Sequence, residues 1–122
     1  MNRILVVEDE ADLAVTYVRL LRRQGYRVVT AASRVEGLKA IESAPLALVI
    51  SDLRLPDGDG LDIIRAARAR DPKVPVIVVT AFASRAARDA ALASGASAFL
   101  AKPFPASALL QLVHDELERS TR

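Results

Sequence analysis

The chain has no cysteine and no tryptophan, and it contains a single histidine and a single methionine. Without cysteine, disulfide scaffolds, cysteine-ligated zinc sites and thiol catalysis are excluded, and a reducing environment is compatible with the composition. Any metal would have to bind mainly through oxygen. The one histidine, His114, falls in the last expected helix with no second histidine as a co-ligand, so we assign it no role.

Long hydrophobic runs are also missing. The first apolar run, residues 4–7, is followed at once by carboxylates and is too short for the core of a signal peptide. No apolar stretch approaches the roughly 20 residues that a membrane-spanning helix requires. We therefore expect a soluble, cytoplasmic protein that does not enter a membrane.

Neither sign of charge dominates. Lysine and arginine number 17 against 15 aspartate and glutamate, which gives a net charge of +2. The arginines lack interleaved aromatic residues and are distributed over expected helices and turns, so we interpret them as solvated and expect no direct nucleic-acid binding. These arginines stand at positions 19, 22, 23, 65, 68, 70, 85 and 88.

The chain is rich in short apolar runs. Its 122 residues are 52% hydrophobic and 26% charged, values typical of a globular protein that buries a core. The length predicts one domain, residues 1–122. Five short apolar runs rich in Val, Ile, Leu or Ala predict strands at Ile4–Val7, Val28–Ala31, Ala47–Ile50, Val76–Val79 and Ala98–Ala101.

Segments with helical periodicity follow these runs, and turn residues mark their ends. Start signals are Ser33 with Glu36 three positions on, Asp59, Ser84, and Pro105 as a first helical residue; stop signals are Gly25, Pro45, Asp71-Pro72 and Gly95. The fourth helix, about Ser84 to Ser94, has mainly alanine to bury, so we expect it to be the most mobile. The apolar positions of the other four are Leu13, Tyr17, Leu20 and Leu21; Val35, Leu38 and Ile41; Leu61, Ile64 and Ala67; and Leu109, Leu110, Val113 and Leu117.

Strict alternation of apolar strands with helices predicts an α/β fold with a parallel sheet and helices on both faces. Five strands favour the doubly wound, flavodoxin-like strand order 2-1-3-4-5. In such sheets ligands bind beyond the carboxyl ends of the strands. Those ends are therefore where a functional site is expected.

Polar residues follow four of the five expected strands. Strand one runs into Glu8 and Asp9, strand three into Asp52, strand four into Thr80 and strand five into Lys102. Taken alone, Glu8 and Asp9 could favour the next helix N-terminus, and Asp52 could form a turn before Pro56. Together they predict that three carboxylates, a hydroxyl and an ammonium converge, and the carboxylates repel one another unless Lys102 or a cation intervenes. Mg²⁺ suits so sparse an oxygen site, because it keeps several waters.

At these positions the sequence resembles the receiver domain of bacterial two-component response regulators. The resemblance rests on four motifs in order: VVEDE at 6–10, SDLRLPDGDG at 51–60, VVTA at 78–81 and AKPF at 101–104. It covers nearly the whole chain. It implies a switch that accepts a phosphoryl group from a histidine kinase or phosphotransfer protein and changes the surface around helix four, strand five and helix five.

The resemblance also implies a role for each motif residue. Asp52 is the phosphoacceptor, and Thr80 and Lys102 contact the phosphoryl group. Mg²⁺ is bound by Asp9, Asp52 and the backbone carbonyl of Arg54, with Glu8 acting through a water. Phe99 corresponds to the switch aromatic, although it could be an ordinary core residue, and the Lys102-Pro103 bond is expected to be cis. A downstream output domain, or self-association, would receive the signal.

Two bulky residues depart from the commonest family pattern: Arg54, two after Asp52, and Phe82, two after Thr80. They flank the expected path of the hydrolytic water, so the lifetime of the phosphoryl group is left open. The DGDG segment at 57–60 resembles the start of a calcium loop, but Leu61 and Arg68 occupy ligand positions.

Two other functions compete with a switch. A Mg²⁺-dependent phosphatase or phosphotransferase would also use an aspartyl phosphate, but such enzymes generally place a second Asp where this chain has Arg54. A flavodoxin-like nucleotide or flavin carrier would need a glycine-rich or hydroxyl-rich phosphate loop, where this chain has carboxylates after its first strand. We therefore expect a module that catalyses only its own phosphorylation and dephosphorylation and is not a turnover enzyme.

Overall fold

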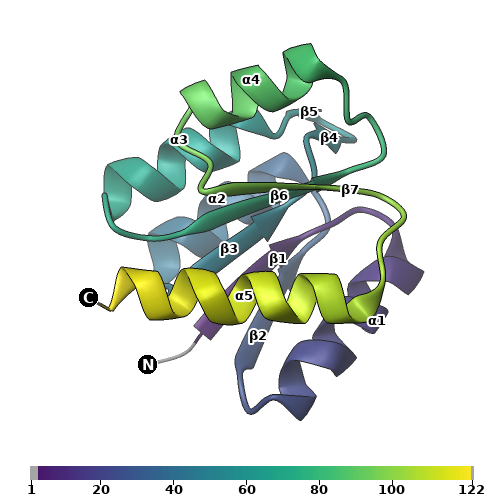
Figure 1. Ribbon diagram of the computed structural model, residues 1–122. Helices are drawn as coiled ribbons and strands as arrows, with labels where there is room; N and C mark the ends of the chain where they lie inside the picture. The colour runs from purple at the N-terminus through teal and green to yellow at the C-terminus, as the bar shows by residue number, and fades with distance from the viewer. Residues whose placement is uncertain (1–2, 122) are drawn as a thin grey trace.

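The computed structural model describes residues 3–121, in which a parallel sheet lies between two layers of helices (Figure 1). Its strands are β1 (Arg3–Val7), β2 (Arg27–Ala31), β3 (Leu48–Ser51), β6 (Val76–Thr80) and β7 (Ala98–Ala101). They are ordered β2-β1-β3-β6-β7, and every neighbouring pair is parallel. The doubly wound order expected from the sequence is confirmed.

Each face of the sheet is covered by its own helices. α1 (Ala11–Arg23) and α5 (Ala106–Ser120) cover one face, and α2 (Arg34–Ser43), α3 (Leu61–Arg70) and α4 (Arg85–Ala93) cover the other. Within residues 3–121, no helix is both long enough and apolar enough to cross a membrane.

The strands are apolar throughout because both of their faces are buried. Along β1, Ile4 and Val6 pack with α1 and α5, whereas Leu5 and Val7 pack with α2 and α3. These four side chains are at most 1% exposed. The central strands therefore form a firm base from which the loops at their carboxyl ends project.

A short antiparallel hairpin between β3 and α3 was not predicted by the sequence pattern. It consists of β4 (Arg54–Leu55) and β5 (Gly58–Asp59). The prediction that α3 starts at Asp59 is wrong, because Asp59 belongs to β5 and the helix begins at Leu61. The Asp59 carboxylate still accepts a hydrogen bond from the Leu61 N–H at 2.8 Å, so it satisfies a donor of the first turn.

The N-terminus of α2 is capped from two directions. Ser33 accepts from the N–H of Glu36, as its position in the sequence suggested. In addition, Asp57 in the hairpin turn accepts from the N–H groups of Arg34 at 2.7 Å and Val35 at 2.9 Å. This long-range cap joins the hairpin to α2.

The predicted apolar side of α2 is wrong at one position. Val35 is 46% exposed, whereas Gly37 and Ile41 are buried. The backbone of Gly37 packs close to the core, since a Cβ atom at this position would lie 2.8 Å from Ile63 Cδ1. The small residue rather than the valine therefore sets how the helix approaches the sheet. At α5 a smaller difference occurs: Pro105 occupies the cap position and the helix begins at Ala106.

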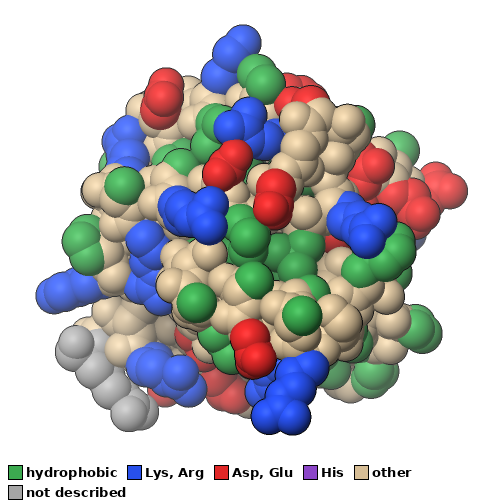
Figure 2. Space-filling view, turned by 90° about the horizontal axis from the view of Figure 1, so that it is seen from above, with side chains coloured by type: hydrophobic (Ala, Val, Ile, Leu, Met, Phe, Trp, Pro, Cys, Tyr) green, Lys and Arg blue, Asp and Glu red, His purple; other side chains and the backbone are tan. Residues whose placement is uncertain are grey.

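Helix α4 is lightly packed, as its alanine content suggested, and Ala91 is the residue of this helix that is buried. Its C-terminal end is nevertheless tethered. Arg68 of α3 donates to the Gly95 carbonyl at 2.8 Å and to Ser97 Oγ at 3.1 Å. The face that includes α4 carries charged side chains of both signs around a central group of hydrophobic ones (Figure 2).

Candidate functional site

Four of the sequence-selected residues meet at the carboxyl edge of the sheet. Glu8 follows β1, Asp52 follows β3, Thr80 ends β6 and Lys102 follows β7. Glu8, Asp52 and Thr80 are buried, with 3%, 7% and 0% of their surface exposed. Parallel strands place their carboxyl ends on one edge, which explains how residues far apart in the chain come together.

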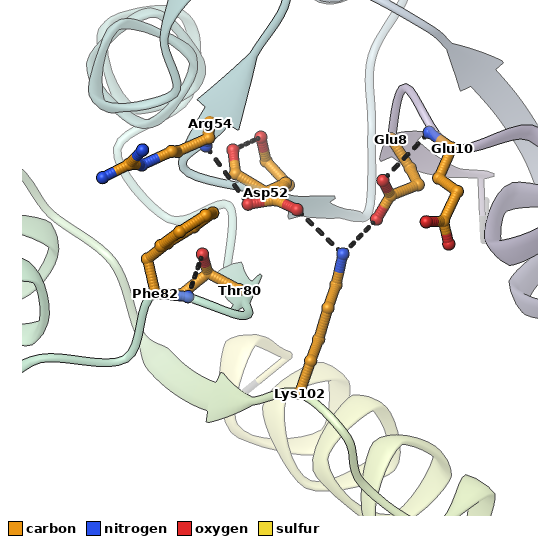
Figure 3. A network of polar contacts seen from close by, with 8 residues as sticks. Glu8, Glu10, Asp52, Arg54, Thr80, Phe82 and Lys102 are labelled. Carbon is orange, nitrogen blue, oxygen red and sulfur yellow. Dashed lines mark hydrogen bonds and ion pairs between the residues drawn. The ribbon is translucent and has the colours of Figure 1, made fainter.

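Lys102 lies between the two buried carboxylates (Figure 3). Its Nζ donates to Glu8 Oε1 at 2.7 Å and to Asp52 Oδ2 at 2.8 Å. The other oxygen of Glu8 accepts from the backbone N–H of Glu10. The backbone of Lys102 is itself fixed, because its N–H donates to the Thr80 carbonyl at 2.9 Å. The ammonium group thus compensates two negative charges that would otherwise repel each other.

Burial and ion pairing shift the pKa values of Glu8 and Lys102 in opposite directions. Burial raises the pKa of Glu8, and the hydrogen bond and charge of Lys102 offset this only in part. Burial would lower the pKa of Lys102, but its hydrogen bonds to Asp52 and Glu8 outweigh burial, so that pKa lies above its usual range. Lys102 is therefore a permanent cation at physiological pH.

Asp52 is held on its other side by the following loop. Its Oδ1 accepts from the Arg54 N–H at 3.1 Å, while the Arg54 guanidinium carbon lies 3.8 Å from the centre of the Phe82 ring. The Phe82 N–H in turn donates to Thr80 Oγ1 at 3.1 Å. A chain of contacts therefore links the loop after β3 to the loop after β6 (Figure 3). The sequence marked Arg54 and Phe82 as bulky, but their separation along the chain gave no sign that they stack.

Only part of the expected convergence is present: Glu8 and Asp52 meet at Lys102, and Asp9 does not join them. Asp9 is exposed and makes no side-chain hydrogen bond or ion pair with the described residues. Across residues 3–121, no three Asp, Glu, His or Cys side chains are grouped so that they could hold a metal ion. Lys102 contacts both Glu8 and Asp52 and compensates their charges. The donors present are nonetheless hard oxygens, and Mg²⁺ commonly takes only one or two carboxylates and keeps waters. The donor set fits Mg²⁺ in kind, without an all-protein cage.

Three further expectations concern residues near the site. Phe99 in β7 is partly buried and packs against the core cluster under α2, α3 and α4. The Lys102-Pro103 bond is cis, as expected. His114 is exposed, with its Nε2 atom 3.6 Å from a carboxylate oxygen of Glu118 on the next turn, in agreement with a solvated position.

The comparisons with known proteins agree with this geometry. Residues 4–114 match the family described as the response regulator receiver domain. The chain is 38% identical over 117 residues to the transcriptional regulatory protein GlrR of Escherichia coli K12, which covers 96% of this chain and 26% of GlrR. More generally, the chain spans between about a quarter and a half of the length of the curated relatives that it matches first.

Solved structures give the same result. A CheY-like response regulator receiver domain from Methanospirillum hungatei JF-1 has a TM-score of 0.95 and 31% identity, covering 99% of this chain and 97% of that one. A second similar structure is the receiver domain of sensor histidine kinase PA1611 from Pseudomonas aeruginosa PAO1, with a TM-score of 0.86 and 31% identity over 96% of this chain and 98% of that one. That structure has a magnesium ion coordinated in its active site cleft. Receiver domains of this kind are signalling switches rather than conventional enzymes. The chain belongs to the response regulator receiver domain family of two-component signalling.

Proposed function

We propose that this domain, residues 1–122, is a cytoplasmic phosphoacceptor switch in which Asp52 receives a phosphoryl group from a histidine kinase or phosphotransfer protein. The observation that carries the proposal is the position of Asp52. Its carboxylate is buried at the carboxyl edge of the sheet and is fixed between the Lys102 ammonium and the Arg54 N–H. A carboxylate held in this way is oriented for attack on phosphorus.

The transfer step uses groups of this chain. An Asp52 carboxylate oxygen would form a bond to phosphorus as the bond from phosphorus to the donor nitrogen breaks, and the electron pair of that bond leaves with the donor imidazole. Lys102, a fixed cation 2.8 Å from Asp52, would stabilise negative charge on the phosphoryl oxygens. Thr80, which ends the adjacent strand, would offer its hydroxyl to the same oxygens once its bond with the Phe82 N–H is released.

Mg²⁺ is the cofactor that we propose for this step. Asp9, Asp52 and the Arg54 backbone carbonyl would hold it, with Glu8 contributing through a water. When bound, Mg²⁺ would supply positive charge that offsets the phosphoryl oxygens. The oxygen-only donor set supports this assignment, as does the magnesium ion in the cleft of the related PA1611 receiver domain. The exposed Asp9 carboxylate, unpaired among the described residues, is available as a ligand without breaking an ion pair.

The switch itself would act through Thr80 and Phe99 on the surface formed by α4, β7 and α5. Thr80 and Phe99 lie on adjacent strands, and α4 is lightly packed. An aspartyl phosphate carries about −1.5 to −2 charges in place of the −1 of the free carboxylate and adds acceptor oxygens, toward which the Thr80 hydroxyl would move. The changed surface would then contact an output domain or a second copy of the domain.

The central test is incubation with acetyl phosphate and Mg²⁺, followed by intact-mass measurement and mapping of the modified residue. We expect one phosphoryl group on Asp52, none on Ser51 and none in Asp52→Asn. Equal labelling of Asp52→Asn and the wild type would contradict the assignment, as would equal labelling with and without Mg²⁺.

The metal assignment has its own test. Asp9→Asn should abolish Mg²⁺ binding, measured by titration calorimetry, because too few direct ligands remain for an ion that loses its waters reluctantly. Glu10→Gln is the matched control, since it removes a neighbouring exposed carboxylate and keeps the backbone N–H that Glu8 accepts. Undiminished Mg²⁺ affinity in Asp9→Asn would show that Asp9 is not a ligand.

A further inference from the structure

A groove between α1 and the edge strand β2 has features of a binding surface that the phosphoacceptor site does not use. Its volume is about 690 Å³. Its lining includes the apolar residues Val15, Val18 and Val28, called its apolar floor below, and the basic residues Arg19, Arg22 and Arg23. Val15 is 55% exposed, although it is a large apolar side chain. Three arginines that the sequence pattern suggested were merely solvated thus surround one hollow.

These arginines carry charge that the rest of the domain does not neutralise. Arg19, Arg22 and Arg23 form no ion pair with the described residues, unlike Arg34, Arg65 and Arg119, which contact carboxylates. On the face that includes α4, both acidic and basic side chains are present (Figure 2). The groove therefore combines an apolar floor with uncompensated positive charge, which favours a ligand that is apolar in part and acidic in part.

The backbone of β2 adds a second observation. β2 pairs only with β1 and lies at the edge of the sheet. The Ala31 carbonyl accepts from the Glu8 N–H, so it points toward β1. Because backbone groups alternate in direction along a strand, Val28 and Thr30 direct their N–H and C=O groups to the open edge. Val28 and Thr30 also line the groove. An extended segment paired with the backbone of Val28 and Thr30 would therefore lie alongside the groove.

We propose that the α1–β2 groove binds an extended acidic segment of a partner protein, which adds a strand parallel or antiparallel to β2. One set of its alternating side chains would face the groove. These would be glutamates, whose methylene groups would lie on Val15 and Val18 while their carboxylates contact Arg19 and Arg22. The other set would be apolar and would cover Val29, which lies on the opposite face of β2 and is 37% exposed. Main-chain pairing would provide affinity, and the charge pattern would provide selectivity.

Other occupants fit the groove less well. A second copy of this domain would bring the same arginines against one another, so like charges would oppose the contact. A nucleic-acid backbone would satisfy the arginines but would leave the apolar floor and the open strand edge unused. Both alternatives nevertheless give distinct outcomes in the test below.

The proposal can be tested with a short, acetylated and amidated peptide of alternating valine and glutamate, titrated into the ¹⁵N-labelled domain. We expect saturable amide shifts at Val28, Thr30 and the C-terminal half of α1. Arg19→Gln/Arg22→Gln should weaken binding about fivefold, since it removes two exposed ion pairs. Arg85→Gln/Arg88→Gln on α4 removes the same charge and should have no effect.

Three further probes decide among the alternatives. Two versions of the valine–glutamate peptide carry N-methyl groups on alternate residues, one on the valines and the other on the glutamates. The version whose methyl groups block the N–H groups that pair with β2 should fail to bind. A valine–lysine peptide and a short single-stranded oligothymidine should not shift the groove amides. The proposal is overturned if both methylated peptides bind as tightly as the unmethylated valine–glutamate peptide. It is also overturned if Arg85→Gln/Arg88→Gln weakens binding as much as Arg19→Gln/Arg22→Gln does, or if the valine–lysine peptide or oligothymidine shifts the groove amides. Peptide-free self-association that is abolished by the α1 variant would also overturn it.

Discussion

Replacing Gly60 with alanine should displace the phosphoacceptor through the backbone. Gly60 precedes α3 and donates its N–H to the Leu53 carbonyl at 2.8 Å. A Cβ atom at position 60 would lie 2.2 Å from the Asp52 carbonyl oxygen and 2.8 Å from Leu53 Cα. Ordinary contacts of a Cβ atom begin near 3.4 Å, so the backbone of Asp52 and Leu53 must retreat by roughly 1 Å. Because backbone atoms, unlike side-chain ends, cannot rotate away, we expect Gly60→Ala to destabilise the domain by about 3 kcal/mol.

The effect on the rate of phosphorylation should be about as large as the effect on folding stability. A displacement of about 1 Å at a reacting group can lower a rate by about a hundredfold. Intact-mass kinetics with acetyl phosphate would measure the rate of labelling, and urea unfolding followed by circular dichroism would measure stability. Gly25→Ala is the control: its φ of +91° makes alanine strained at a cost of about 1 kcal/mol, yet the added Cβ meets no atom within 4 Å. A Gly60→Ala domain that is labelled at the wild-type rate and is as stable as Gly25→Ala would refute the reasoning.

Three other predictions follow from the contacts around this loop. Thr80→Ala should still be phosphorylated but should not switch, because the hydroxyl that would leave the Phe82 N–H is gone; the idea fails if beryllofluoride shifts the amides of α4 and Phe99 as fully as in the wild type. Arg54→Ala/Phe82→Ala should lose its phosphoryl group about two- to fivefold faster than the wild type, because the cation and ring that stack 3.8 Å apart would no longer cover Asp52. Its Mg²⁺ affinity should stay unchanged. Phosphate release at or below the wild-type rate would count against shielding. The Val35 N–H, with the N–H and charge of Arg34, holds the pKa of the Asp57 carboxyl below its usual range, so its stabilising effect is present above the unfolded pKa of about 4 and is lost as pH falls through the folded value. The stability difference between wild type and Asp57→Asn should therefore be constant from neutral pH down to about pH 5 and should shrink below about pH 4, and a difference that is the same at all pH values would exclude the carboxylate as its source.

The strands could be predicted closely because each is apolar on both faces and short. All five predicted runs lie within one residue of the observed ends, and the carboxyl-edge location of Glu8, Asp52, Thr80 and Lys102 followed from strand order alone. The hairpin β4–β5 was missed because two-residue strands carry no periodicity. Val35 was assigned to the buried side of α2 because a valine is more apolar than a glycine, whereas close packing against Ile63 required the glycine at position 37.

The detailed arrangement of the site could not be predicted for a different reason. Position along the chain says which groups share the edge of the sheet, but it does not say which pairs of them form bonds. Lys102 carries a long, flexible side chain that could have pointed to solvent, to one carboxylate or to both. In the structure it contacts both Glu8 and Asp52, so it supplies positive charge that offsets the repulsion between them.

The attachment of α4 also depends on contacts that no local pattern reveals. Its alanines predicted weak packing, and that prediction is confirmed by the single buried residue, Ala91. Its two ends nevertheless differ. At the C-terminal end Arg68 binds the Gly95 carbonyl and Ser97, and Ser97 Oγ also accepts from the Val76 N–H, so this end is joined to both α3 and β6. At the N-terminal end Ser84 caps the helix locally, and the preceding loop is held by the Phe82 contacts with Thr80 and Arg54. Since those contacts are the ones that a phosphoryl group on Asp52 would disturb, a response of α4 should begin at its first turn and diminish toward Gly95.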